Sequence, residues 1–171
     1  MQTGLKFAGV SIAVFYLGTS LAPGASGAWS FGTEDRGHPV LSYAENSKTI
    51  FQVGCGHAFA LHAVYPGSRQ KEREKARITI DNGKRRMNFA GEISESFEND
   101  PPNTTHFVQW DLGYKRQDPR LYGKRWKVRE HRLLDFLDSG RPLKVSAAGG
   151  RGYVLPPVEA RGWKSRFEQI C

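Results

Sequence analysis

The chain holds two cysteines, and one of them is its last residue. Cys55 and Cys171 therefore allow a single intramolecular pairing. A disulfide between them would tie an early segment to the end of the chain, and the chain-entropy model values closure of so long a loop at about 4–5 kcal/mol. The alternative is a reactive thiol, because His57 lies close to Cys55 in the sequence and a Cys–His pair supports nucleophilic chemistry. We expect the structural disulfide.

Residues 1–28 have the layout of a secretory signal peptide, in which a charged start, an apolar run and a small-residue cleavage zone follow one another. Lys6 is the one charged side chain of this segment, and the apolar run covers residues 10–17. We expect cleavage after Ala28, which leaves residues 29–171 as a single β-rich domain in the periplasm or outside the cell, where disulfides persist. An uncleaved anchor is the alternative, although the apolar run is shorter than the roughly 20 residues that span a bilayer.

The balance of charge is basic. The chain has 25 Lys and Arg against 17 Asp and Glu, a formal net charge of +8 that falls to +7 when Lys6 leaves with the signal peptide. A basic exported domain attracts anionic polymers, lipid headgroups or acidic proteins, whereas nucleic acid is not the expected partner in the cell envelope. The alternative is that the charge serves solubility alone. No later segment is apolar enough to cross a membrane, so we expect no transmembrane segment in the mature chain.

Alternation of apolar and polar residues dominates the rest of the chain and is typical of strands with one buried face. Strands are predicted over residues 40–43, 49–55, 58–65, 75–81, 84–90, 106–114, 143–147 and 153–155. The strongest local signal is Asn82-Gly83 between two alternating runs. It predicts a type I′ hairpin turn, because both central residues of that turn need a positive φ. Residues 91–104 are acidic and then proline-rich, which predicts a mobile loop.

Two short stretches change from the strand period to the helical one. Apolar residues fall at helical spacing from Trp126 to Leu137, and Gly140 is the expected left-handed end of that helix. A second amphipathic helix is expected near residues 160–170. The predicted fold is therefore mainly β, a β-sandwich or partly open barrel of hairpin-linked antiparallel strands, with the two short helices covering one opening or edge.

The sequence lacks the spacing patterns of common catalytic, metal and cofactor sites. The five histidines do not have the paired spacing of a zinc site. The glycine-rich turn at residues 149–152 lacks the Lys-Ser/Thr pair of a phosphate-binding loop, and a hairpin explains it. Paired carboxylates for hydrolysis need a defined separation in space, which spacing along the chain does not give. We therefore expect no cofactor, and we favour a protein that is not an enzyme.

The segment from Tyr114 to Arg132 combines basic and aromatic residues and is the predicted binding site. Its expected ligand-binding residues are Lys115, Arg116, Arg120, Tyr122, Lys124, Arg125, Trp126, Lys127 and Arg129. Basic side chains attract phosphates or carboxylates, and aromatic rings stack on bases or sugars. In this hypothesis Lys84-Arg85-Arg86, after the Asn-Gly turn, extends the same surface. The alternative is a solvated loop whose aromatic residues anchor it to the core.

Several features follow one another along the chain. A tryptophan comes soon after the leader (Trp29), an early strand ends in cysteine (Cys55), and a hairpin contains aspartate (Asp81). A leucine-rich helix (Leu133-Leu134-Phe136-Leu137) then precedes a strand (Val145), and a last amphipathic helix ends in cysteine (Phe167-Glu168-Gln169-Ile170-Cys171). This layout resembles the small periplasmic accessory proteins associated with type VI secretion. The resemblance implies an envelope protein that is not an enzyme and brings no catalytic residues with it. The Tyr114–Arg132 segment and the proline-rich loop do not belong to that pattern.

Together these features predict an exported, non-enzymatic binding or accessory protein. It would engage an anionic envelope component or an acidic partner through its basic and aromatic residues. Two alternatives stay open. One is a small secreted hydrolase of envelope polymer, which needs polar side chains converging in a cleft. The other is a secreted inhibitor or effector module that acts through a loop such as residues 91–104. The sequence does not fix the oligomeric state.

Overall fold

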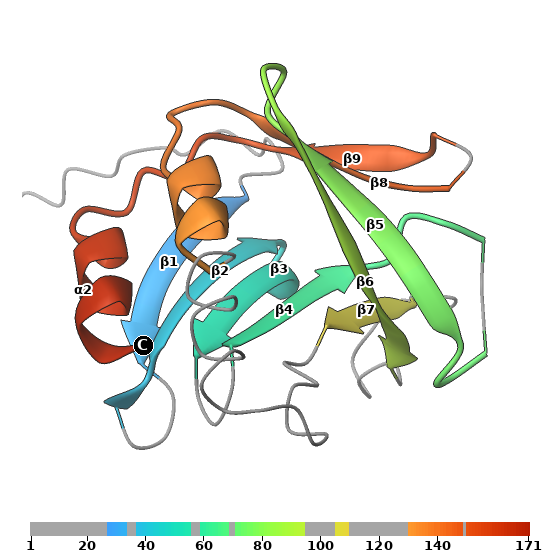
Figure 1. Cartoon of the computed structure of the whole chain (residues 1–171), viewed down its shortest axis with the longest axis horizontal. Helices are drawn as coiled ribbons and strands as arrows, with labels where there is room; N and C mark the ends of the chain where they lie inside the picture. Colours follow the sequence, from blue (N-terminus) through green and yellow to red (C-terminus); the bar gives the residue numbers. More distant parts are fainter. Residues whose placement is uncertain are drawn as a thin grey trace, which may run out of the picture.

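The described residues fold into one curled antiparallel sheet with two helices (Figure 1). A computed structural model of the chain describes residues 27–33, 37–55, 59–68, 71–94, 105–109, 130–148 and 150–171. The strands are β1 (Ala28–Thr33), β2 (Pro39–Glu45), β3 (Lys48–Cys55), β4 (Phe59–Val64), β5 (Lys75–Asp81), β6 (Arg86–Ser94), β7 (His106–Gln109), β8 (Leu143–Ala147) and β9 (Gly152–Leu155). Residues 130–137 are helical, and α2 (Trp163–Ile170) is the second helix.

The sheet is built from two runs of neighbouring strands that meet in its middle. Across the described part of the chain the strand order is β1-β2-β3-β4-β7-β6-β5-β8-β9, and every neighbouring pair is antiparallel. Hairpins link β1 to β4 in sequence, and β4 then pairs with β7 rather than with β5. The β8–β9 hairpin extends the sheet beyond β5. The prediction of a mainly β fold, in its partly open barrel form, is confirmed.

The two ends of the sheet approach each other because the sheet is strongly curled. The indole Nε1 of Trp29 on β1 donates a hydrogen bond of 2.9 Å to the carbonyl oxygen of Pro156, just after β9. The Tyr153 hydroxyl on β9 lies 3.2 Å from the carbonyl oxygen of Ile50 and 3.1 Å from that of Val64. Burial raises the pKa of Tyr153 far above its ordinary value, so this hydroxyl stays a proton donor. These bonds hold the half-barrel in its curled form.

The inner face of the curl and both helices share one hydrophobic core. Its largest fully buried side chains are Phe51, Phe107, Phe136, Phe167, Leu41, Leu61, Ile78, Ile80, Leu133, Leu137, Leu143 and Leu155. Full burial of a side chain of this size stabilises the folded state by about 1.5–3 kcal/mol. The ring of Phe167 on α2 also lies 6.2 Å, centroid to centroid, from Phe31 on β1. Figure 1 shows both helices on the β1–β2 side of the molecule.

The alternating pattern correctly identified the inward face of the central strands. Phe51 and Val53 of β3 lie opposite Ala63 and Leu61 of β4, and all four side chains are buried. Side chains of successive strand residues point to opposite faces, so residues of one parity go to the core and the others face outward.

The helix at residues 130–137 ends where the sequence predicts. Gly140 has a φ of 64°, the left-handed conformation that glycine adopts without strain. The beginning of the predicted helix, residues 126–129, lies outside the described residues. The predicted C-terminal helix is α2, which buries Trp163 and Phe167.

The turn between β5 and β6 differs from the predicted type I′ turn. The ladder leaves four residues, 82–85, in the loop, and only Gly83 of the central Asn-Gly pair has a positive φ, of 78°. Asn82 is instead buried, and its side-chain Oδ1 accepts the backbone N–H of Arg85 at 2.9 Å while its Nδ2 donates to Ser139 Oγ at 3.3 Å. The asparagine therefore closes the turn through its side chain, which removes its need for left-handed backbone.

The geometry expected of a type I′ turn occurs instead between β2 and β3. Glu45 and Lys48 form the last ladder pair, so the loop has two residues. Both of them have a positive φ, 50° at Asn46 and 65° at Ser47. Serine seldom adopts this conformation, and this is why the pair gives a weaker sequence signal than Asn-Gly.

Two further strand assignments are corrected by the structure. β1 was not predicted; its inward residues Trp29 and Phe31, separated by Ser30, are only half-buried. Residues 91–94 were assigned to a mobile loop, whereas they continue β6. Ile93 is buried in the core, and its neighbour Glu92 on the outer face forms an ion pair with Lys75 of β5. This end of the strand is therefore held on both faces.

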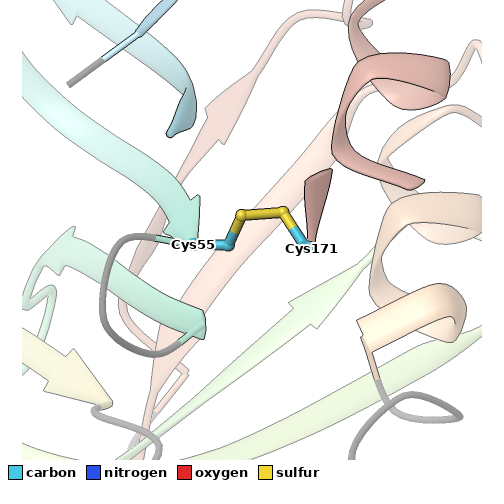
Figure 2. The surroundings of a disulfide bond; sticks show 2 residues. All are labelled: Cys55 and Cys171. Atoms are coloured by element: carbon cyan, nitrogen blue, oxygen red, sulfur yellow. A yellow bond between two sulfur atoms is a disulfide. The ribbon is translucent and has the colours of Figure 1, made fainter. Parts of the chain in front are cut away.

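A disulfide joins Cys55, the last residue of β3, to Cys171, the residue after α2 (Figure 2). The two Cα atoms are 6.0 Å apart, and 116 positions separate the residues in the chain. The predicted pairing is therefore present. The alternative of a reactive Cys55 thiol is wrong for this structure, since the described residues contain no free cysteine.

We expect the double variant Cys55→Ser, Cys171→Ser to lose about 4–5 kcal/mol of unfolding free energy, because its unfolded chain is no longer closed into a long loop. Urea denaturation followed by circular dichroism measures this loss. The unmodified protein in excess dithiothreitol is the control and should lose the same amount. Equal stability of oxidised and reduced protein would contradict the expectation.

Candidate functional site

The predicted basic-aromatic site lies outside the described residues. It comprises Lys115, Arg116, Arg120, Tyr122, Lys124, Arg125, Trp126, Lys127 and Arg129. The end of the strand predicted over residues 106–114 and the predicted signal peptide up to residue 26 also lie outside them. The binding role of this segment stays a prediction.

A second set of cations lies on the outer face of β5, β6 and β8, which we call the basic face. Its members are Lys75, Arg77, Thr79 and Asp81 of β5, Arg86, Asn88, Ala90 and Glu92 of β6, and Lys144 and Ser146 of β8. The four cations are all exposed and outnumber the two carboxylates. The neighbouring residues of opposite parity are in the core, so strand alternation alone places these side chains together.

Both carboxylates of the basic face already have cationic partners. Arg86 Nε lies 2.9 Å from Asp81 Oδ2, and Lys75 forms an ion pair with Glu92. Lys144 of β8 lies opposite Asp81 in the ladder. Each such pair is exposed and adds little stability, but the face keeps a net positive charge after its own acids are paired.

Arg77 stands at the middle of this face without an acidic partner in the described part of the chain. Its cross-strand neighbour on β6 is Ala90, which is exposed and too short to reach the guanidinium. The flanking outward residues of β5 are Lys75 and Thr79. A guanidinium in such a position offers its planar donors to an external carboxylate, sulfate or phosphate.

Asp81 orders one end of the basic face. The pKa of its carboxyl is lowered, chiefly because the backbone N–H of Gly83 donates to it at 2.7 Å, and further because Arg86 donates to it. The carboxylate therefore stays ionised in weak acid and holds the Arg86 guanidinium beside the turn.

Neutral polar side chains lie between the cations. Thr79 Oγ1 donates to Asn88 Oδ1 at 2.9 Å across β5 and β6, and Ser146 of β8 lies opposite Thr79 on its other side. Gly152 of β9 follows next to Ser146. A side chain at position 152 is excluded, since a Cβ there would lie 2.2 Å from the carbonyl oxygen of Val145. The strip is therefore polar and low in relief.

The pairing of β4 with β7 brings two histidines together on the outer face. The ring centroids of His62 and His106 are 4.8 Å apart, with their planes at 48°. His106 is only 1% exposed. The sequence predicted scattered histidines, and this pair was missed because it depends on two strands that are distant in the chain.

A small cleft lies beside the disulfide. Its lining residues are Phe59, Glu130, His131, Leu134, Phe167, Glu168 and Cys171. Within it, His131 Nδ1 lies 3.9 Å from Glu168 Oε1. Both sulfurs are engaged in the disulfide (Figure 2), so the cleft offers no thiolate. Over the described ranges, no three His, Cys, Asp or Glu side chains form a group that could hold a metal ion.

A lysine joins the two helices next to this cleft. Lys164 Nζ on α2 lies 2.6 Å from Asp135 Oδ1 and 3.6 Å from Asp138 Oδ2, both at the end of the other helix. The hydrogen bond from Lys164 lowers the pKa of Asp135, and the same bond raises the pKa of Lys164. The pair therefore favours the folded state while both groups are charged.

No protein-family model, no curated protein and no solved structure matches this chain. Its function therefore has to be inferred from the fold and from the surface that the fold presents.

We expect Lys164→Met to lower the unfolding free energy by about 0.5 kcal/mol near neutral pH, the size of an exposed ion pair. Asp135 has its pKa lowered from 3.8, so its contribution is present above that value and is lost as pH falls through the folded pKa. Lys164 has its pKa raised from 10.5, so its contribution is lost as pH rises through the folded value. The unfolding free energies of Lys164→Met and of the unmodified protein should therefore become equal in strong acid and in strong base.

Urea denaturation across pH measures this profile. Arg166→Met, which removes an exposed cation from the same helix, is the matched control. Its unfolding free energy should not fall below that of the unmodified protein in the pH range between the two pKa values. If Lys164→Met instead lowered the unfolding free energy by the same amount at every pH, the loss would come from packing and not from the ion pair.

Proposed function

We propose that this protein is an exported, non-enzymatic binding or accessory protein that engages an anionic envelope component or an acidic partner. The observation that carries the proposal is the basic face, where exposed cations outnumber carboxylates that already have cationic partners. A surface with this excess attracts anions over a distance and holds them by charge-assisted hydrogen bonds.

Two features support the location outside the cytosol. The first 28 residues have the order of a secretory signal, and a disulfide closes the chain between Cys55 and Cys171. The described residues include no helix long and apolar enough to cross a membrane. The resemblance in layout to the periplasmic accessory proteins associated with type VI secretion is consistent with the same location.

The basic-aromatic segment enters the proposal as a second contact with the same partner. Its aromatic residues Tyr122 and Trp126 supply ring faces, and its cations supply charge.

Export is tested by intact-mass spectrometry of the untreated protein from cell fractions. We expect a chain that starts at Trp29, has 143 of the 171 residues and is two hydrogens lighter than its reduced form. A variant with charged residues in the apolar run, Val14→Lys and Leu17→Lys, is the control and should stay cytosolic. An intact leader on soluble cytosolic protein, or two free thiols, would overturn the export proposal.

We expect the triple variant Lys124→Glu, Arg125→Glu, Lys127→Glu to lose retention on immobilised dextran sulfate without unfolding, because it reverses three charges of the proposed binding segment. The salt concentration at elution measures the effect. The triple variant Arg141→Glu, Arg161→Glu, Arg166→Glu makes the same change of net charge at exposed positions elsewhere and is the matched control. Equal loss in both variants would indicate a response to net charge alone, and unchanged retention in the first would defeat this part of the proposal.

A further inference from the structure

The cations of the basic face follow a line rather than a cluster. Lys75 and Arg77 lie along β5, and Arg86 and Lys144 flank the far end of the same strand. β5 has seven residues, which at roughly 3.3 Å per residue gives the line a length of about 20 Å. A line of positive charge fits an extended polyanion better than it fits a single small anion, which would need convergent donors.

Hydrogen-bonding groups fill the interval between the charges. Thr79, Asn88 and Ser146 form a row across β6, β5 and β8, between Arg77 on one side and the Arg86–Lys144 pair on the other. Hydroxyl and amide side chains both donate and accept hydrogen bonds, as sugar hydroxyls do. The row therefore matches a chain that carries neutral hydroxyls between its charged groups.

The relief of the face favours an extended ligand as well. Ala90 and Gly152 are the exposed residues beside Arg77 and Ser146, and neither rises above the sheet. A larger residue cannot stand at position 152, because the carbonyl oxygen of Val145 occupies the place of its Cβ. A flat polar strip of this kind lets a polymer lie across several strands.

From this arrangement we infer that the basic face binds a linear anionic polysaccharide, an inference that rests on the proposed function. The polymer lies over β5, with Arg77 holding one acidic group and Arg86 and Lys144 holding the next. The hydroxyl and amide row contacts the sugar hydroxyls between them. Carboxylated and sulfated polymers share this chemistry, and the experiment below separates them.

Other macromolecular anions fit the same face less well. Single-stranded nucleic acid is held by aromatic rings that stack on its bases, and the basic face carries no aromatic side chain. Insertion into a membrane surface needs an apolar stripe, whereas Val154 and Ile170 are the exposed large hydrophobic residues of the described chain. A stable protein interface has an aromatic or aliphatic centre, whereas the exposed large apolar side chain beside this face is Val154 at its edge, opposite Lys144.

The test compares the full mature chain with the double variant Arg77→Glu, Lys144→Glu. Binding is measured by isothermal titration calorimetry against polygalacturonate and against dextran sulfate, at several salt concentrations. We expect the double variant to raise Kd at least about tenfold and to flatten the salt dependence, because fewer counterions are released from the polymer. The variant Arg161→Glu, Arg166→Glu has the same net charge and should bind as the unmodified protein does.

A neutral variant, Arg77→Gln, Lys144→Gln, keeps the test independent of charge reversal and should show a smaller loss in the same direction. Thermal unfolding of each variant checks that the fold is kept. We expect it to be kept, because the substituted residues are exposed. Tighter binding to polygalacturonate than to dextran sulfate would identify carboxylate as the preferred group, and the reverse order would identify sulfate. Both outcomes support a polysaccharide site.

Three results would overturn the inference. Unchanged affinity in the Arg77→Glu, Lys144→Glu variant would remove the site from this face. Tighter binding of the unmodified protein to phosphatidylglycerol vesicles or to single-stranded DNA would replace the polysaccharide with a membrane or a nucleic acid. If this variant keeps its affinity while the Lys124, Arg125, Lys127 variant loses it, the inference fails and the proposed function stands; if the unmodified protein binds no polyanion at all, both fail.

Discussion

The pairing of β4 with β7 is the interaction on which the rest of the structure depends. It joins the run β1-β2-β3-β4, whose strands are consecutive in the chain, to the run β7-β6-β5-β8-β9, and it brings Val64 next to His106 across a long interval of the chain. Phe107 of β7 is fully buried beneath the joined sheet. On the other side of β7, Gly91 of β6 allows β6 and β7 to approach closely, because a Cβ there would lie 2.3 Å from the carbonyl oxygen of Val108. Without the β4–β7 pair, the two runs would not be joined into one sheet.

Local patterns in the sequence predicted most strands and both helices. In a strand, alternate residues are buried, and in a helix the buried residues recur at helical spacing. The alternation over β3 and β4 and the end of the helix at Gly140 are examples. Turn geometry was harder to predict. Asn82 uses its side chain to close a four-residue loop, whereas Asn46 adopts the left-handed backbone itself, and the same amino acid therefore gives opposite results. The strand order was not predictable, since it depends on pairing between distant segments.

The candidate surface shows the same division between local and long-range information. The basic-aromatic segment attracted attention because its charges are consecutive in the sequence. Arg77 and Lys144 are far apart in the chain and are brought together only by the pairing of β5 with β8. The usable signal was the outward parity of the predicted strands at 75–81 and 143–147, which already carries more cations than acids. The histidine pair left no comparable signal, because its two strands meet only in the assembled sheet.

The contact between Trp29 and Pro156 has a consequence for how copies of this protein meet in concentrated solution. An open sheet ends in unpaired backbone groups, and such edges recruit strands from other molecules into aggregates. Here one rim is folded towards the other, and the outermost strand β9 has four residues followed by Pro156 and Pro157, which have no N–H to offer. The curl that encloses the hydrophobic interior therefore also leaves less unpaired backbone at the sheet edges to which a strand of another molecule could bind.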